Sequence, residues 1–408
     1  MDSKSDRRRF LQQTAALAGV AAGAGLAAKS GPANAQGNNV HAEPPRRGAR
    51  YRIDHMTHYT PLHEYNGIIT PSRLHFMQQH SSEYPEIEEA RHTLKIFGLV
   101  DRPLSFSVAD LKRLPSVSRV HFLECHGNSS PAIHGEGDEN MGLPIQYIHG
   151  MTSCSEWTGV PMSVLLREAG VKTAGTWLVN EGDDAGKFSH TLPTAKAIED
   201  CFVAYGQNGD PLRIEQGYPI RLIVPGWEAP FSVKYLRAIK VVDQPYNAWN
   251  ESMNHSVARP DLGNKARWYH FAFGPKSVIT RPSAGMEMRR GYNQITGLAW
   301  SGGGKITKVE ITTDGKNWRQ AKIQEPVHTK AHTRFTFDWE WTGQEAMLVS
   351  RSTDETGELQ PTLAEMSKYH GISMAEWRSK EKPRSIHTNW QQPWKVNKDG
   401  SISDAMFA

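Results

Sequence analysis

Cysteine is scarce in this chain, with 3 among 408 residues. Three cysteines are too few for a disulfide scaffold, and their odd number leaves at least one thiol unpaired. No two of them form a Cys-x-x-Cys pair, so a zinc ribbon or a thioredoxin-type site has no support in the sequence. The absence of a Cys-x-x-Cys-His motif excludes covalent attachment of a c-type haem through that motif.

The net charge is also small, and long apolar runs are absent from the sequence. The chain has 47 Lys and Arg against 43 Asp and Glu, a formal charge of +4, which is too weak to indicate nucleic-acid binding. No run of 18 strongly apolar residues occurs, so we do not expect a membrane span. Hydrophobic residues at 38% and charged residues at 22% suit a soluble globular protein, and the length suggests two or three domains.

The first 35 residues have the three-part pattern of an export signal. A basic segment with Arg7–Arg9 precedes an Ala- and Gly-rich stretch, Thr14–Ala28, and then Ala33-Asn34-Ala35, which resembles a cleavage site. Because Asp6–Leu11 also resembles a twin-arginine signal, we predict that residues 1–35 are a twin-arginine signal peptide for export to the bacterial periplasm. The rest of the chain has 42 basic and 41 acidic residues, so the mild basicity says little about a partner.

Two domains are expected after the signal peptide and an N-terminal extension at 36–60. Over about 200 residues, mixed strand and helix patterns predict an α+β domain, which we place at 61–262. The expected strands are Thr93–Val100, Val120–Glu124, Thr176–Asn180 and Pro219–Val224, and the expected helices are Ser107–Lys112, Pro161–Glu168 and Pro193–Glu199.

The pattern changes after about Ser277. Ile306–Thr312 alternates, turns at Asp314-Gly315 and returns through Trp318–Ile323, which is typical of a β-hairpin. Further alternating strands are expected at Thr333–Trp341 and Ala346–Ser352, and helices at Leu363–Met366 and Met374–Trp377. We therefore predict a β-sandwich at 275–400.

Cys125 is the main candidate for chemistry. It follows the apolar strand that ends at Glu124, and Gly127 after it permits unusual backbone angles or close approach of a ligand. On this spacing alone a structural cysteine, a metal ligand and a nucleophile all stay open. In an oxidising periplasm a free thiolate is a hazard unless a ligand occupies it. Cys154 and Cys201 are interpreted as small buried residues.

Five ordered segments across both predicted domains resemble the sulfite oxidase family of molybdopterin enzymes. Within that family they are most similar to the molybdenum subunits of the periplasmic sulfite/sulfane dehydrogenases of the Sox system. The segments are Gly67–Pro71, Phe122–Cys125, His149–Pro161, Gly217–Gly226 and Gly297–Gly304. The resemblance implies a molybdopterin-binding domain followed by an immunoglobulin-like sandwich that often forms dimers.

The resemblance also implies a cofactor site. Cys125 matches the thiolate that binds molybdenum, which is sensible chemistry because a soft sulfur ligand suits a metal already held by dithiolene sulfurs. Gln216 stands where a histidine contact is usual in the family. The residues expected to bind the molybdenum–molybdopterin cofactor are Phe76, His80, Asp184, Gln216, Arg221, Ser232, Val233 and Lys234.

The substrate side departs from the animal and plant sulfite oxidases. Where those enzymes have arginines this chain has Gln78, Ser130 and His387, and the tyrosine position falls near Asn254-His255. Free sulfite should therefore bind poorly unless histidines supply positive charge, for which the candidates are His126, His134, His255 and His387. Of these, we assign His126 and His255 to catalysis together with Cys125.

A polar, Gly-rich insertion, Ile133–Asn140, is expected to form a loop near the pocket mouth. Its acidic residues would repel free anions and favour a bulkier or carrier-bound sulfur substrate. An exposed loop without a role is the plainer interpretation.

The sequence therefore predicts periplasmic, molybdenum-dependent oxidation of sulfite or sulfane-type sulfur. A separate c-type cytochrome is the expected electron acceptor, because the chain has no haem attachment motif of its own, and a homodimer or hetero-oligomer is expected. Two alternatives stay open: a reductase on the same scaffold, for instance of sulfoxides, and a non-catalytic protein that binds an electron-transfer partner. A zinc hydrolase has less support, because no His-Glu-x-x-His or comparable spacing occurs.

Overall fold

The computed structural model describes residues 57–81, 83–132, 142–258, 262–263, 265–378 and 387–406. The expected signal peptide, most of the expected extension at 36–60 and the expected loop Ile133–Asn140 with His134 lie outside the described residues.

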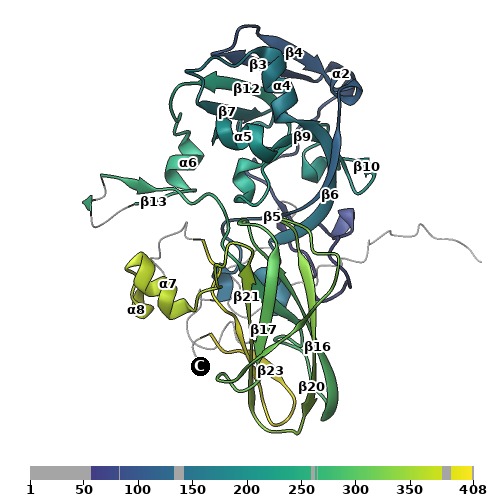
Figure 1. The fold of residues 1–408 in the computed structure, drawn as a ribbon, viewed down its shortest axis with the longest axis vertical. Coiled ribbons are helices and arrows are strands. Elements are labelled where there is room, and N and C mark those ends of the chain that lie inside the picture. The colour runs from purple at the N-terminus through teal and green to yellow at the C-terminus, as the bar shows by residue number, and fades with distance from the viewer. Residues whose placement is uncertain are drawn as a thin grey trace, which may run out of the picture. The chain divides into compact units, whose positions relative to one another are not determined.

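The first domain contains two five-stranded sheets (Figure 1). One sheet has the strand order β10-β9-β6-β5, and a fifth strand, β11, also pairs with β9. The bounds of these strands are β5 (Val117–Glu124), β6 (Thr152–Pro161), β9 (Phe202–Gln207), β10 (Asp210–Pro211) and β11 (Arg221–Ile223). The other sheet has the order β4-β3-β12-β7-β8, with β3 (Thr93–Gly98), β4 (Leu104–Ser107), β7 (Trp177–Gly182), β8 (Ser189–Pro193) and β12 (Leu236–Val242). The pairing of β12 with β3 is parallel. The predicted α+β domain is confirmed.

Short helices pack on these sheets where the sequence provides caps. Helix α2 (Val108–Arg113) begins with a capping box, in which Ser107 and Asp110 exchange hydrogen bonds. Helix α4 (Met162–Ala169) follows Pro161 and ends at Gly170, whose φ of +68° lies in the left-handed region that glycine tolerates. Helix α5 (Thr194–Asp200) follows Pro193 in the same way. The apolar faces of all three helices join one core with β3, β7 and β12.

Strand β6 was not predicted, although it is 10 residues long. Its side chains include Ser153, Cys154, Ser155 and Gly159, which are small and have little strand preference. The strand lies between β5 and β9, and residues on both of its faces are buried. A strand buried on both faces has no alternation of polar and apolar residues, which is the pattern that sequence reasoning depends on.

The second domain is a sandwich of two antiparallel sheets, as predicted. One sheet has the order β15-β16-β20-β19, with β15 (Lys276–Arg281), β16 (Gly291–Trp300), β19 (Lys322–Ile323) and β20 (Thr333–Trp341). The other has the order β18-β17-β21-β22-β23, with β17 (Ile306–Thr312), β18 (Trp318–Gln320), β21 (Ala346–Asp354), β22 (Pro393–Val396) and β23 (Ile402–Asp404). The domain boundaries at 262 and 275 stay predictions.

The expected hairpin is correct for its first half and wrong for its second. Strand β17 pairs with β18, but the segment Trp318–Ile323 is not one strand. At the buried Ala321, whose N–H donates to the Val309 carbonyl, the chain crosses from one sheet to the other, and β19 then pairs with β20. An alternating pattern does not reveal such a crossing, because the period of the side chains is the same in either sheet.

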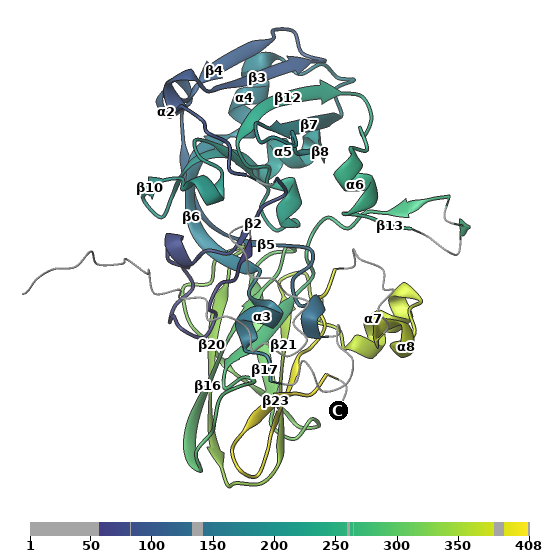
Figure 2. The same ribbon diagram turned by 180° about the vertical axis from the view of Figure 1, so that it is seen from behind.

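Helices α7 (Leu363–His370) and α8 (Met374–Arg378) confirm the two helix signals after the sandwich strands. Helix α3 (Ile145–His149), which was not predicted, lies beside the sandwich strands in Figure 2, and its Ile145 and Ile148 belong to the sandwich core. Phe122 of β5 and Cys154 of β6 join the same core. The two predicted domains therefore share a hydrophobic core. No helix in the described part of the chain is both long and apolar enough to cross a membrane.

The sandwich has a buried polar crosslink whose removal should be costly. The Gln360 side chain is fully buried, and its Oε1 accepts hydrogen bonds from the Ser277 N–H, the Ser277 hydroxyl and the Ser352 N–H at 2.9, 2.7 and 3.3 Å. We expect Gln360→Met to lower the free energy of unfolding by about 2–4 kcal/mol, because buried donors lose their acceptor. Chemical denaturation measures this, with the exposed Gln320→Met as control, for which a change within about 0.5 kcal/mol is expected. Equal effects of the two substitutions would contradict the role of Gln360.

Candidate cofactor and active site

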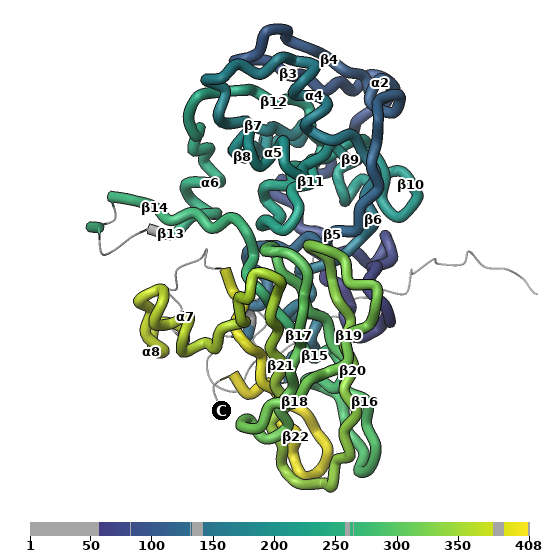
Figure 3. Tube along the Cα trace, viewed as in Figure 1, coloured from purple at the N-terminus to yellow at the C-terminus, as the bar shows by residue number. Residues whose placement is uncertain are grey.

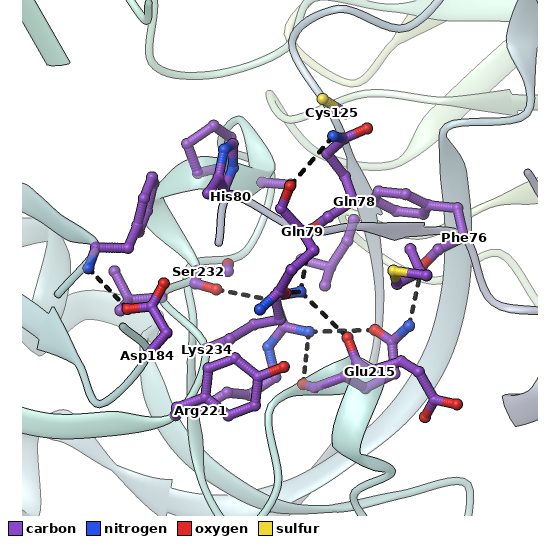
Figure 4. Close-up of a pocket in the computed structure, with 18 residues that line it drawn as sticks. Phe76, Gln78, Gln79, His80, Cys125, Asp184, Glu215, Arg221, Ser232 and Lys234 are labelled. Atoms are coloured by element: carbon purple, nitrogen blue, oxygen red, sulfur yellow. Dashed lines mark hydrogen bonds between the residues drawn. The ribbon is translucent and has the colours of Figure 1, made fainter. Parts of the chain in front are cut away.

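A pocket in the first domain brings together nine of the predicted site residues (Figure 4). Cys125 and all eight residues expected to bind the cofactor line it, although they come from widely separated parts of the chain. In Figure 4, Cys125 lies at the upper edge of the close-up and Arg221 and Lys234 lie lower. The predicted catalytic residues His126 and His255 are not among the residues that line this pocket.

Cys125 is held at the end of β5. Its N–H donates to the Met151 carbonyl at 2.9 Å, and its side chain is 8% exposed in a small apolar cluster with Phe76 and Trp157. Burial raises the pKa of the Cys125 thiol to about 12. A thiol in such surroundings is a poor nucleophile, whereas a bound metal deprotonates its cysteine ligand. The structure therefore favours the ligand interpretation of Cys125 over the nucleophile.

The turn after Cys125 differs from expectation. Gly127 does not have a positive φ, and a Cβ built there would meet only the Met151 side chain, at 3.8 Å. The left-handed residue of this turn is Ser129, with φ of +69°. The expectation of unusual backbone angles at Gly127 is therefore wrong.

Two cationic side chains face the pocket without a carboxylate partner. Neither Arg221 nor Lys234 forms an ion pair within the described part of the chain. Arg221, 4% exposed, donates to the carbonyls of Gln216 and Ser232 at 3.0 and 2.8 Å, and its Nε has no partner. Burial and the charge of Arg221 lower the pKa of Lys234 to about 7. A phosphate group bound here would supply the missing negative charge.

Gln216 and Ser232 orient these cations. The Gln216 amide donates to the Phe76 carbonyl at 2.9 Å and its Oε1 accepts from Arg221 at 3.3 Å. The Ser232 hydroxyl donates no hydrogen bond to the pocket but accepts one from the Val224 N–H at 3.0 Å. Val233 contributes a buried apolar surface. These residues therefore fix the position of Arg221 on the pocket wall.

Asp184 and His80 also line the pocket. Asp184 accepts hydrogen bonds from the Phe188 N–H at 2.8 Å and from the Ser81 hydroxyl. The His80 ring stacks on the Phe188 ring with centroids 4.6 Å apart. Sequence reasoning missed Phe188 and Gln79, whose Oε1 accepts from Lys234 at 2.7 Å. Gln79 adjoins His80, which the resemblance had already implied, and could have been found, whereas nothing in the sequence marks Phe188.

A group of four histidine rings lies beside the pocket residues. The His126 ring is 4.7 Å from that of His255, which in turn is 5.3 Å from His190 and 5.9 Å from His80. His190 was not predicted, and its Nδ1 lies 3.2 Å from a carboxylate oxygen of Glu251. The histidine group brings the two predicted catalytic histidines together.

In the cofactor-free protein the surroundings of the described candidate histidines disfavour the positive charge that binding of free sulfite would need. Burial and neighbouring histidines lower the pKa of His126 to about 4 and lower that of His255 further. Burial also holds the pKa of His387 well below its ordinary value, and its Nε2 accepts a hydrogen bond from the Gly274 N–H at 3.0 Å. These rings are therefore uncharged at neutral pH. The hydroxyl of Ser130, which stands at one of the expected arginine positions, donates to the Gly127 carbonyl at 2.8 Å.

Two family descriptions match the chain. Residues 81–250 match an oxidoreductase molybdopterin-binding domain, and residues 269–379 match a Mo-co oxidoreductase dimerisation domain. Both matches follow the order of the two domains seen in the structure.

Individual proteins are also similar. A crystal structure of the sulfane dehydrogenase SoxCD from Paracoccus pantotrophus is 34% identical, with a TM-score of 0.80, over 94% of this chain and 96% of that one. The NADH nitrate reductase of Ulva prolifera is 29% identical over 73% of this chain and 38% of its own length. The NADH nitrate reductase of Volvox carteri is 30% identical over 74% of this chain and 38% of its own length. The chain thus spans less than two fifths of the length of these two nitrate reductases.

The fold, the pocket and these similarities define the class of protein: the chain is a molybdopterin-dependent oxidoreductase. It belongs to the sulfite oxidase family, whose cofactor is molybdenum–molybdopterin. The two pocket cations, which form no ion pair among the described residues, and the buried Cys125 fit that anionic, metal-bearing group.

Lys234 should make the stability of the cofactor-free protein depend on pH. Its pKa is about 7 in the folded protein and about 10.4 in an unfolded chain, so between these values the unfolded chain binds more protons. The free energy of unfolding should therefore rise with pH across this window, by about 2 kcal/mol between pH 7 and pH 9 from this group. Lys234→Met should remove that increment, as measured by denaturation at both pH values. The exposed Lys240→Met serves as control and should retain it.

Proposed function

We propose that this protein oxidises sulfite or a sulfane-type sulfur group and passes the electrons to a c-type cytochrome. The observation that carries the proposal is the similarity to the sulfane dehydrogenase structure over almost the whole of both chains. The pocket adds a buried thiol and two cations without carboxylate partners.

In this proposal each pocket residue has a role. Cys125 is the protein ligand of the metal, while Arg221 and Lys234 bind the phosphate end of the pterin. Phe76, Gln216, Ser232 and Val233 hold Arg221 and the wall of the pocket in place, and His80 and Asp184 also line the pocket. When bound, the cofactor supplies two-electron redox chemistry and oxygen-atom transfer, which no side chain can perform.

The substrate end of the pocket lacks fixed positive charge. Gln78, which lines the pocket, is neutral, and burial keeps His126 and His255 uncharged at neutral pH. Each charge-assisted hydrogen bond to a small dianion is worth about 1.5–3 kcal/mol, and such bonds would be missing here. We therefore favour a sulfur group on a larger or carrier-bound substrate, which His126 and His255 would orient as neutral hydrogen-bonding groups.

The partners and location complete the proposal. The three cysteines are buried and far apart in the sequence, so a haem acceptor would be a separate cytochrome. The match to a dimerisation domain supports a homodimer or a hetero-oligomer. Export to the periplasm is proposed from the sequence of residues 1–35.

A reductase is the second candidate, because nitrate reductases are among the relatives of this chain. On the same scaffold, electrons would flow toward the cofactor and nitrate or a sulfoxide would be reduced. Purified protein loaded with molybdenum should reduce ferricytochrome c with sulfite, thiosulfate or a persulfide-bearing carrier. Oxidation of reduced viologen by nitrate, without any of the first activity, would favour the reductase. Protein free of molybdenum and pterin after correct maturation would overturn both.

Cys125→Ser should lower turnover by at least about 100-fold, because a serine oxygen is a harder and weaker ligand for this metal. The thermal transition should stay close to that of the parent protein, since the substitution is nearly isosteric. Cys201→Ser is the matched control, because Cys201 is equally buried and lies outside the pocket lining. It should retain activity, and loss of activity in both variants to the same degree would contradict the role of Cys125.

A further inference from the structure

The residue before Cys125 is a carboxylate with an unusual set of partners. Glu124 is completely buried. Its Oε1 accepts hydrogen bonds from the Lys276 ammonium at 2.6 Å and from the Asn128 amide at 2.8 Å. Its Oε2 accepts from the Trp300 indole N–H at 2.6 Å. Each carboxylate oxygen therefore accepts at least one hydrogen bond.

Two of these donors come from the β-sandwich rather than from the cofactor domain. Lys276 is the first residue of β15 and Trp300 is the last residue of β16, and the two are directly paired across the strands. In Figure 3, β5, which carries Glu124, lies where the first domain meets the β-sandwich. Lys276 and Trp300 are 1% and 0% exposed, so the sandwich places both donors in a site shielded from bulk solvent.

Burying this charged group is costly unless the geometry is good. Removing a carboxylate and an ammonium from water costs several kcal/mol for each ion, and their attraction offsets this only with further hydrogen bonds. A hydrophobic pair would hold the two domains together equally well, since they already share a core. Contact between the domains therefore does not by itself explain why the Glu124–Lys276 ion pair is buried.

The hydrogen bonds continue from Glu124 into the backbone around Cys125. Asn128, which donates to Glu124, accepts from the Met151 N–H at 3.0 Å through its Oδ1. Its own N–H donates to the Cys125 carbonyl at 2.9 Å. Met151 in turn accepts the Cys125 N–H at 2.9 Å. A shift of the Glu124 carboxylate would therefore reach the peptide groups on both sides of Cys125.

We propose that Lys276 and Trp300 are positioning residues: through Glu124 and Asn128 they fix the direction in which the Cys125 sulfur points. This inference rests on the proposed role of Cys125 as the metal ligand. Neither residue lines the pocket, so they act on the ligand rather than on the cofactor or the substrate. The β-sandwich then contributes two residues that position the metal ligand of the active site.

Trp300→Phe is the sharpest test, because it removes the N–H donor and keeps an aromatic ring in the core. The matched control is Trp394→Phe: Trp394 is also 0% exposed in the sandwich core and donates its N–H to the Ile279 carbonyl at 3.1 Å, away from Cys125. Both variants should lose similar thermal stability. Trp300→Phe alone should shift the Mo(V) electron paramagnetic resonance g-values and the thiolate-to-metal absorption band, and should lower kcat by about 10-fold with KM unchanged.

Lys276 supplies a second, independent comparison. Lys276→Arg keeps the positive charge but changes the size and donor geometry, so it should shift the spectrum less than Lys276→Met, which removes the charge and the donor. Molybdenum content is measured first for every variant. Parent protein that never retains molybdenum would overturn the proposed function. Fully loaded Trp300→Phe protein with the spectrum, reduction potential and kcat of the parent would overturn the positioning role alone.

Discussion

The central constraint in this molecule is the placement of two cations, the buried Arg221 and the half-buried Lys234, in a pocket where they donate to carbonyl and amide oxygens and form no ion pair among the described residues. Carbonyl dipoles orient an ammonium or a guanidinium group without neutralising it, while desolvation and the neighbouring charge of Arg221 lower the pKa of Lys234 to about 7. Such an arrangement is unfavourable for a protein that works without a ligand. It is well suited to one that takes up a phosphorylated cofactor, because the binding energy of the anion then offsets the cost of keeping the site open.

Cys125 is subject to the same reasoning at the other side of the pocket. Its apolar surroundings disfavour the thiolate in the absence of a metal, which keeps the free thiol unreactive. A metal that binds must displace the proton, and the direction of the sulfur then decides the geometry of the bond. The rigid hydrogen bonds to Met151 and Asn128 on either side of the cysteine meet this demand, and they extend into the β-sandwich through Glu124.

Sequence reasoning found the parts of the site that the family resemblance marks. Cys125 and Arg221 lie in segments that resemble the sulfite oxidase family, and the same resemblance implied Lys234, whereas the local pattern around Cys125 alone left its role open. Lys276 and Trp300 could not be found in this way, because they lie more than 150 positions from Glu124 in the chain and only the fold brings them together. The small-residue strand β6 was missed because burial on both faces removes the alternating pattern. The crossing between sheets at Ala321 was missed because it leaves the alternating pattern unchanged.

The histidines show why residue type alone is a poor guide to charge. An isolated imidazole has a pKa near 6.5, which makes His126 and His255 natural candidates for binding an anion. In the fold these rings contact one another, so protonation of one opposes protonation of the next, and burial opposes both. The cations of this pocket are thus confined to Arg221 and Lys234, which we assign to the cofactor. A small dianion at the Cys125 side would lose its hydration without gaining a cationic partner, whereas a substrate that leaves its charged groups in solvent and inserts only a sulfur atom would not.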